Sequence, residues 1–139
     1  VAIDPETGDL VAGGTTGVDS VPIRDGELGQ GLKTYQDDAT TLVRAFRATD
    51  GSIAHTYPGP GGTVQGVSVS QGGRYVAASK SRMMGISPSY ILLWNARNGQ
   101  LLSAKDCGDT EVGNVAFDPT GTQLAYAVGS RIYISKLPQ

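Results

Sequence analysis

Cysteine, histidine and tryptophan each occur only once in the 139 residues of this chain. A single cysteine, Cys107, cannot form an intrachain disulfide, which excludes a small secreted scaffold held together by such bridges. One cysteine and one histidine also exclude a zinc site built from clusters of these residues. We therefore expect no metal site. We expect Cys107 to be a buried or loop thiol, because no histidine stands near it in the sequence.

Charge of one sign and long apolar runs are also lacking. The chain has 11 Lys and Arg against 13 Asp and Glu, so its formal net charge is only −2. Nothing in this balance favours nucleic acid or an anionic membrane as a partner. No apolar run approaches the ~20 residues that span a bilayer, and no signal peptide is visible. These absences predict a soluble domain, which we place in the cytoplasm.

Glycine is abundant instead, with 20 residues, while aromatic residues make up only 6% of the chain. A glycine inside a helix costs about 1 kcal/mol relative to alanine, so this composition favours strands and turns. No segment shows a sustained helical period. The sequence therefore predicts an all-β fold.

Two segments repeat at one offset of 48 residues. "VQGVSVSQGGRYVAAS" (Val64–Ser79) aligns with "VGNVAFDPTGTQLAYA" (Val112–Ala127), and the opening "VAIDPETGDLVAG" (Val1–Gly13) resembles the same phrase. The offset also relates "VRAFRATDG" (Val43–Gly51) to "LLWNARNG" (Leu92–Gly99). Two unrelated segment types with one offset indicate a true repeat, with units at approximately 1–59, 60–108 and 109–139.

Each unit is expected to contain up to four strands. The first strand alternates apolar and small residues, and a turn with Gly73 or Gly121 at a positive φ leads to the second. The third strand, "YILLWN" in the second unit, is rich in β-forming residues and ends in the turn "ARNG". The last unit stops after its third strand, "RIYISK".

The phrase "VGNVAFDPTGTQLAYA" and the strand "ILLWNARNG", with Trp94-Asn95 where Trp-Asp is usual, resemble the WD40 repeat. The resemblance implies a β-propeller of four-stranded antiparallel blades, of which roughly two and two-thirds are present. It makes Phe46, Trp94 and Phe117 structural residues of the blades, together with Gly73 and Gly121 in the turns. No unit has the Gly-His pair or an intact Trp-Asp, so the tetrad that braces many WD40 blades cannot be assembled, and Ser135 stands where the last aromatic would be.

Three alternatives remain open at this stage. "ARNGQLLSAK" and "ATDGSIAHTY" also resemble quinoprotein propellers, which implies an oxidoreductase with a quinone cofactor, although the tryptophan after the turn and a cluster of acidic calcium ligands are absent. The other two are a self-sufficient β-sandwich and a glycan-binding propeller. We favour a non-enzymatic scaffold that needs no cofactor.

The chain begins at Val1 rather than at Met, and it ends on a third strand. WD40 propellers commonly close their ring with an N-terminal strand that completes the last blade. We therefore expect this chain to be the C-terminal part of a larger propeller, with the ring completed by another segment or subunit.

Candidate partner-binding residues lie in the connections between second and third strands, because insertions on one face of a repeat array often mark its binding face. The connection at 15–40 is long in the first unit, and "KSRMMGISPS" is shorter in the second. His55, by contrast, is expected to be a surface or packing residue of a strand rather than a catalytic base. The residues predicted to contact a protein partner are Ile23, Arg24, Tyr35, Lys80, Arg82, Met83 and Met84.

Overall fold

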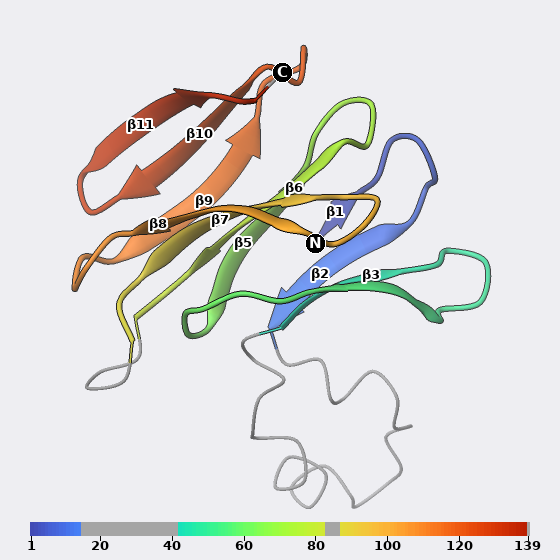
Figure 1. Cartoon of the computed structure of the whole chain (residues 1–139), viewed down its shortest axis with the longest axis horizontal. Coiled ribbons are helices and arrows are strands. Elements are labelled where there is room, and N and C mark those ends of the chain that lie inside the picture. Colours follow the sequence, from blue (N-terminus) through green and yellow to red (C-terminus); the bar gives the residue numbers. More distant parts are fainter. Residues whose placement is uncertain (15–41, 83–86, 139) are drawn as a thin grey trace, which may run out of the picture.

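The computed structural model describes residues 1–14, 42–82 and 87–138. Within these ranges the chain is all-β, with strands and turns and no helix, as the composition predicts. Accordingly, these ranges contain no helix long and apolar enough to cross a membrane. The strands form three antiparallel sheets that follow one another along the chain (Figure 1).

The order of strands within each sheet is the order along the chain. The first sheet contains β1 (Ala2–Ile3), β2 (Leu10–Gly14), β3 (Leu42–Phe46) and β4 (Ile53–Tyr57). The second contains β5 (Val64–Val69), β6 (Tyr75–Lys80), β7 (Tyr90–Asn95) and β8 (Leu101–Asp106). The third has only three strands, β9 (Val112–Phe117), β10 (Gln123–Val128) and β11 (Arg131–Lys136).

The turns between first and second strands are built as the repeat predicts. Gly73 and Gly121 have φ angles of +65° and +71°, a region that side chains with a Cβ rarely adopt. In the third sheet, the N–H of Gly121 donates to the carbonyl oxygen of Asp118 at 3.0 Å. Pro119, between them, presets one backbone angle of this tight turn.

The second sheet is covered on both faces by the other two. We call the face of a sheet that is turned toward the preceding sheet along the chain its backward face, and the opposite one its forward face. The first sheet has no preceding sheet, so its backward face is the one turned away from the second sheet, and the forward face of the third sheet is likewise the one turned away from the second. Successive side chains of a strand alternate between these faces. In β7, Leu92 and Trp94 point backward to the first sheet, while Ile91 and Leu93 point forward to the third.

Two apolar cores result, one between each pair of neighbouring sheets. The first joins Val11, Val43 and Tyr57 to Leu92 and Trp94. The second, between the second and third sheets, contains Tyr75, Ala77, Ile91, Leu93, Val112, Val115, Leu124, Tyr126 and Leu137. Each large apolar side chain that is fully buried contributes about 1.5–3 kcal/mol, so these cores are the main source of stability.

The register places equivalent residues of the sheets in equivalent rows. In the second sheet, Val69 pairs with Val76, Val76 with Trp94, and Trp94 with Leu101, which makes one backward-facing row across all four strands. The corresponding row of the third sheet is Phe117, Leu124 and Ser135. The corresponding row of the first is Ile3, Leu10, Phe46 and Ile53. All three rows therefore have the same place in their sheets.

The second sheet approaches its neighbours most closely through its first strand, β5, which lies beside β2 of the first sheet and β9 of the third. A Cβ on Gly66 of β5 would lie 2.6 Å from Oδ1 and 3.2 Å from Cα of Asn114 in β9, so a larger residue at this position would require Asn114 to move. Farther out, the bulky rings of Tyr57 and Trp94 separate the first and second sheets. The sheets therefore lie closest together along β5 and farther apart where these rings lie between them.

Candidate interaction surface

The C-terminal ends of the second strands lie on one side of the stack. Gly13, near the end of β2, packs directly against Val64 at the start of β5. Ser79, near the end of β6, donates from its hydroxyl to the carbonyl oxygen of Gly113 in β9 at 2.5 Å. The ends of β2, β6 and β10 are thus neighbours, each beside the start of a first strand (Figure 1). We call this side the loop side.

Arg82 and Glu111 form an ion pair on the loop side, across the boundary between the second and third sheets. Nε of Arg82 lies 3.2 Å from Oε1 of Glu111, and the two side chains are 35% and 67% exposed. An exposed pair of this kind contributes at most about 1 kcal/mol to stability. Both charges are therefore accessible to a partner.

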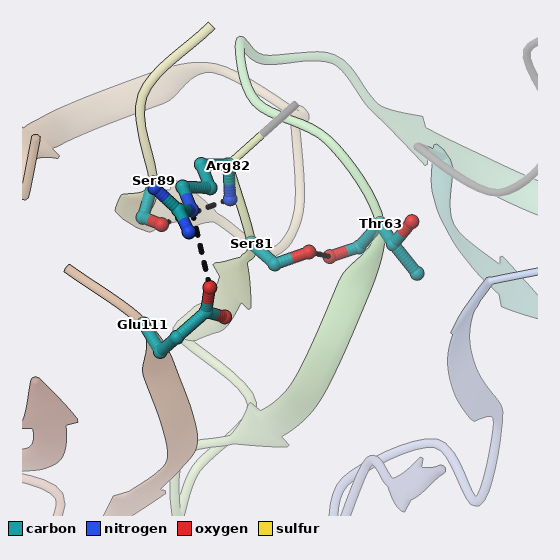
Figure 2. A network of polar contacts seen from close by, with 5 residues as sticks. All are labelled: Thr63, Ser81, Arg82, Ser89 and Glu111. Atoms are coloured by element: carbon teal, nitrogen blue, oxygen red, sulfur yellow. Dashed lines mark hydrogen bonds and ion pairs between the residues drawn. The ribbon is translucent and has the colours of Figure 1, made fainter. Parts of the chain in front are cut away.

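Backbone-directed hydrogen bonds hold the segment around this pair (Figure 2). The buried hydroxyl of Ser89 accepts a hydrogen bond from the backbone N–H of Arg82 at 2.9 Å. The hydroxyl of Ser81 donates to the carbonyl oxygen of Thr63 at 3.2 Å. The backbone N–H of Arg82 and the residue before it are therefore held by hydrogen bonds, which limits the entropy lost when a partner binds Arg82.

The same backbone bond recurs in the third sheet. The N–H of Ser81 donates to the carbonyl oxygen of Thr63 at 2.8 Å, and that of Gly129 donates to Glu111 at 2.7 Å. Both residues of the second bond lie 48 positions after those of the first. The loop side is therefore built from repeated elements, with Glu111 at the position of Thr63.

Lys80 does not lie on the exposed part of this surface, contrary to the sequence-based prediction. It is 1% exposed, on the backward face of β6, and its Nζ donates to the carbonyl oxygen of Gly59 at 3.1 Å. Burial lowers its pKa from 10.5 to about 8. Alternation along β6 places Lys80 on the same face as Val76 and Ala78, so it is shielded between the sheets and cannot contact a partner directly.

The other predicted partner contacts fall elsewhere. Arg82 is on the described surface, as stated above. The remaining five lie outside the described residues: Ile23, Arg24, Tyr35, Met83 and Met84.

The structural residues predicted from the repeat have differing surroundings. Trp94 is 0% exposed and lies between the first two sheets, and Phe117 packs against the core between the second and third. Phe46 has the register position of Trp94, but it is on the backward face of the first sheet, where no described element covers it. Equivalent positions thus have unequal burial.

A cavity of about 250 Å³ opens between the second and third sheets beside Ser135. Its walls include Leu93, Leu124 and Leu137. Ser135 has the position of Trp94, and Tyr126 that of Ala78, so the large and small residues are exchanged between the two sheets. The hydroxyls of Tyr126 and Ser135 lie 3.1 Å apart and share a hydrogen bond.

The next question is whether His55, Cys107 or a group of acidic residues in the described ranges forms a catalytic or metal site. His55 is half-buried on β4, with its ring 6.0 Å from that of Tyr57. Burial raises the pKa of the Cys107 thiol, which disfavours the nucleophilic thiolate. No group of three or more His, Cys, Asp or Glu residues in residues 1–14, 42–82 and 87–138 could hold a metal ion.

Sequence reasoning missed Glu111, Thr63 and Ser89. The 48-residue offset pairs Thr63 with Glu111 directly before the first strands, so this offset was the available signal for the first two. The role of Ser89 depends on a hydrogen bond to a residue seven positions earlier, for which the sequence has no comparable pattern.

Comparisons with known proteins give a fold likeness only. No family model matches the chain, and no curated protein matches it. The crystal structure of the computationally designed Ika4 protein is similar, with a TM-score of 0.55 and 15% sequence identity. The match covers 69% of this chain and 54% of the Ika4 chain, so this chain matches about half the length of that protein.

Proposed function

We propose that this chain is part of a WD40-like β-propeller and acts as a non-enzymatic scaffold that presents its loop side to a protein partner. In this proposal the three sheets are roughly two and two-thirds blades. The observation that carries it is the recurrence of one backward-facing row, at one register, in all three sheets. A repeat that stacks each sheet on the next in the same sense is what a propeller requires.

The wedge shape of the stack supports this reading. Gly66 allows the first strands of the second and third sheets to approach closely, while Tyr57 and Trp94 hold the first and second sheets apart farther out. Sheets that converge at their first strands can be arranged radially about an axis. A sandwich of two parallel layers would instead keep a constant spacing of about 10 Å.

The third sheet has a free strand edge that fits the expected completion of a ring. β11 pairs with β10 on one side, and no described strand pairs with its other edge. In the first and second sheets the corresponding place is taken by β4 and β8. The proposal assigns this place, and the rest of the ring, to a further propeller segment or subunit.

The loop side is the proposed partner surface because it combines accessible charge with hydrogen bonds that hold the backbone at Ser81 and Arg82. Arg82 can donate several hydrogen bonds in one plane, and arginine is enriched among residues that dominate binding energy. Glu111 offers an acceptor beside it. This pairing of charges suits a protein surface that carries both signs.

Site-specific photo-cross-linking tests the proposal. A benzophenone amino acid is placed at position 82 or 111 on the loop side, and at position 98 or 120 in turns at the opposite ends of the strands, as a matched control. The same protein should be cross-linked from both loop-side positions and from neither control position. Binding of that protein, once purified, should weaken at least tenfold with Arg82→Glu, and Arg97→Glu should leave it unchanged.

Two results would contradict the proposal. One is cross-linking that is equally strong from positions 98 and 120. The other is an unchanged affinity of the purified partner for the Arg82→Glu chain, with folding confirmed by circular dichroism.

A further inference from the structure

The forward face of the third sheet exposes aliphatic side chains that the other sheets bury. Ile132 and Ile134 of β11 are 77% and 66% exposed. Their register equivalents in β7, Ile91 and Leu93, are 5% and 7% exposed, because the third sheet covers them. The pairing partners of Ile132 and Ile134 in β10 are Ala127 and Ala125, so the exposed rows are small and aliphatic.

The backward face of the first sheet also exposes apolar side chains whose equivalents in the second sheet are buried. The row Ile3, Leu10, Phe46 and Ile53 crosses all four strands, and its three aliphatic members are 64%, 40% and 47% exposed. The equivalent row of the second sheet includes Val76 and Trp94, which are 1% and 0% exposed. The next row on this face of the first sheet is polar, with Arg44 paired to Thr56, so the apolar centre is confined to the first row.

Within the chain, the first and second sheets and the second and third sheets each pack with the forward face of one against the backward face of the next. The exposed forward face of the third sheet and the exposed backward face of the first sheet could pack against each other in the same way, and one chain has both of these faces. We propose that a second copy of this chain covers both faces, head to tail, with the first sheet of each copy against the third sheet of the other. This inference depends on the propeller arrangement proposed above and names the partner that covers its two outward faces.

Geometry and charge agree with two copies. Two chains of three sheets give six sheets, within the usual range of four to eight blades. A head-to-tail contact made twice closes the assembly, whereas a contact that did not close would produce filaments. The net charge of −2 for each chain gives little repulsion between copies. On the forward face, a depression of about 150 Å³ lined by Ala116, Ala125 and Ile134 can receive an apolar side chain.

Analytical ultracentrifugation of the 139-residue chain tests the inference. The expected mass is twice the 14.4 kDa of one chain. Ile134→Glu on the forward face and Leu10→Glu on the backward face should each give monomers. Leu102→Glu is the matched control, since Leu102 is 40% exposed on β8, outside both faces, and it should leave the dimer intact. The circular dichroism of all variants should match that of the parent chain.

A mixture of the two disrupted variants distinguishes head-to-tail contacts from like-to-like contacts. The intact first sheet of the Ile134→Glu chain can still cover the intact third sheet of the Leu10→Glu chain. Equimolar mixing should therefore restore dimers that contain one copy of each, with weaker association than the parent because one of two contacts remains.

Several results would overturn the inference. They are a monomeric parent chain at 100 µM, an assembly larger than a dimer, loss of the dimer in Leu102→Glu, and a mixture that stays monomeric. If the parent is monomeric while cross-linking from positions 82 and 111 still captures one protein, the second copy is excluded and the scaffold function stands.

Discussion

The indole Nε1 of Trp94 donates a hydrogen bond to the carbonyl oxygen of Pro58 at 2.6 Å. Pro58 directly follows β4, the last strand of the first sheet, and Trp94 lies in the third strand of the second. The ring of Trp94 also lies 5.7 Å from that of Tyr57, at an angle of 48°. One residue thus fixes both the spacing of the two sheets and the path of the chain between them.

Truncation of Trp94 is therefore expected to be among the most destabilising single changes. Trp94→Ala should lower the free energy of unfolding by about 3–5 kcal/mol, from lost burial and the resulting cavity. Trp94→Phe should cost less, because it keeps an aromatic ring and loses chiefly the hydrogen bond, worth about 1 kcal/mol. Urea denaturation followed by circular dichroism measures both.

Phe46 supplies the matched control, because it has the same register position on an uncovered face. Measured at nanomolar concentration, where a dimer would dissociate, Phe46→Ala should cost less than half as much as Trp94→Ala. Equal losses would show that the first sheet is covered in the monomer and that the two faces differ less than the structure indicates.

Lys80 should reduce stability at neutral pH. Because its pKa is lowered from 10.5 to about 8 in the folded chain, the unfolded chain binds more protons between these values, and stability rises with pH across this window. Below about pH 8 the cost of burying the charge is fully present. Lys80→Met should therefore increase the free energy of unfolding at pH 7 by about 1–3 kcal/mol.

The comparison of pH profiles makes this test specific. Val128 has the position of Lys80 in the third sheet, so an apolar side chain is accommodated there. The rise in stability between pH 8 and 10.5 should be smaller in Lys80→Met than in the parent chain, and Lys136→Met, at an exposed site, should retain the parent profile. An identical profile in all three proteins would mean that Lys80 is solvated.

Asp118 should stabilise the turn between β9 and β10 as an ionised carboxylate. It accepts hydrogen bonds from the hydroxyl of Thr120 at 2.6 Å and from the backbone N–H of Gln123 at 3.0 Å, and these bonds lower its pKa to about 2. A lowered pKa contributes stability above about pH 4 that is lost as the pH falls toward 2. Thermal melting should therefore show a smaller decrease over this window for Asp118→Asn than for the parent.

Alanine at the same position removes the acceptor as well as the charge. Asp118→Ala should melt several degrees below Asp118→Asn at pH 6, since the amide oxygen of asparagine can still accept from the backbone of Thr122 and Gln123. If both variants have the same melting temperature, the hydrogen bonds to residue 118 do not stabilise the turn, and Pro119 and Gly121 alone hold it.

Tyr126 and Ser135 should be energetically coupled, because both line the same cavity between the second and third sheets, where Tyr126 is large and Ser135 is small. Ser135→Trp alone should be destabilising through overpacking, and Tyr126→Ala alone through cavity formation. The double variant reproduces the Ala78 and Trp94 arrangement of the second sheet and should recover at least 1 kcal/mol relative to the sum of the single changes. Denaturation of all four proteins of this cycle measures the coupling, and additive losses would contradict it.

Much of the strand organisation could be predicted from local pattern. The alternation in β5 and β9, the β-forming run of β7 and the positive φ of Gly73 and Gly121 are all properties of short segments, and the structure confirms them. The three-stranded last unit follows from counting the same segments. That the sheets are propeller blades stays a proposal.

The candidate surface was less predictable because it depends on contacts between distant residues. The burial of Lys80 results from alternation along β6 combined with coverage by the first sheet, whereas the sequence-based prediction placed Lys80 in the connection that follows this strand. Glu111 becomes a surface partner of Arg82 only when the start of β9 lies beside the end of β6. Such pairings depend on the sheet-to-sheet packing, which the pattern of one segment does not encode.

The absence of a side chain at Gly66 would have a consequence for repeat number if the sheets are the propeller blades proposed above. The closeness of β5 and β9 at this residue contributes to the angle between the second and third sheets. A larger residue that Asn114 did not make room for would push these strands apart and reduce that angle. In a ring of such sheets, a smaller angle means that more sheets are needed for closure, so one codon in β5 would act on the number of blades.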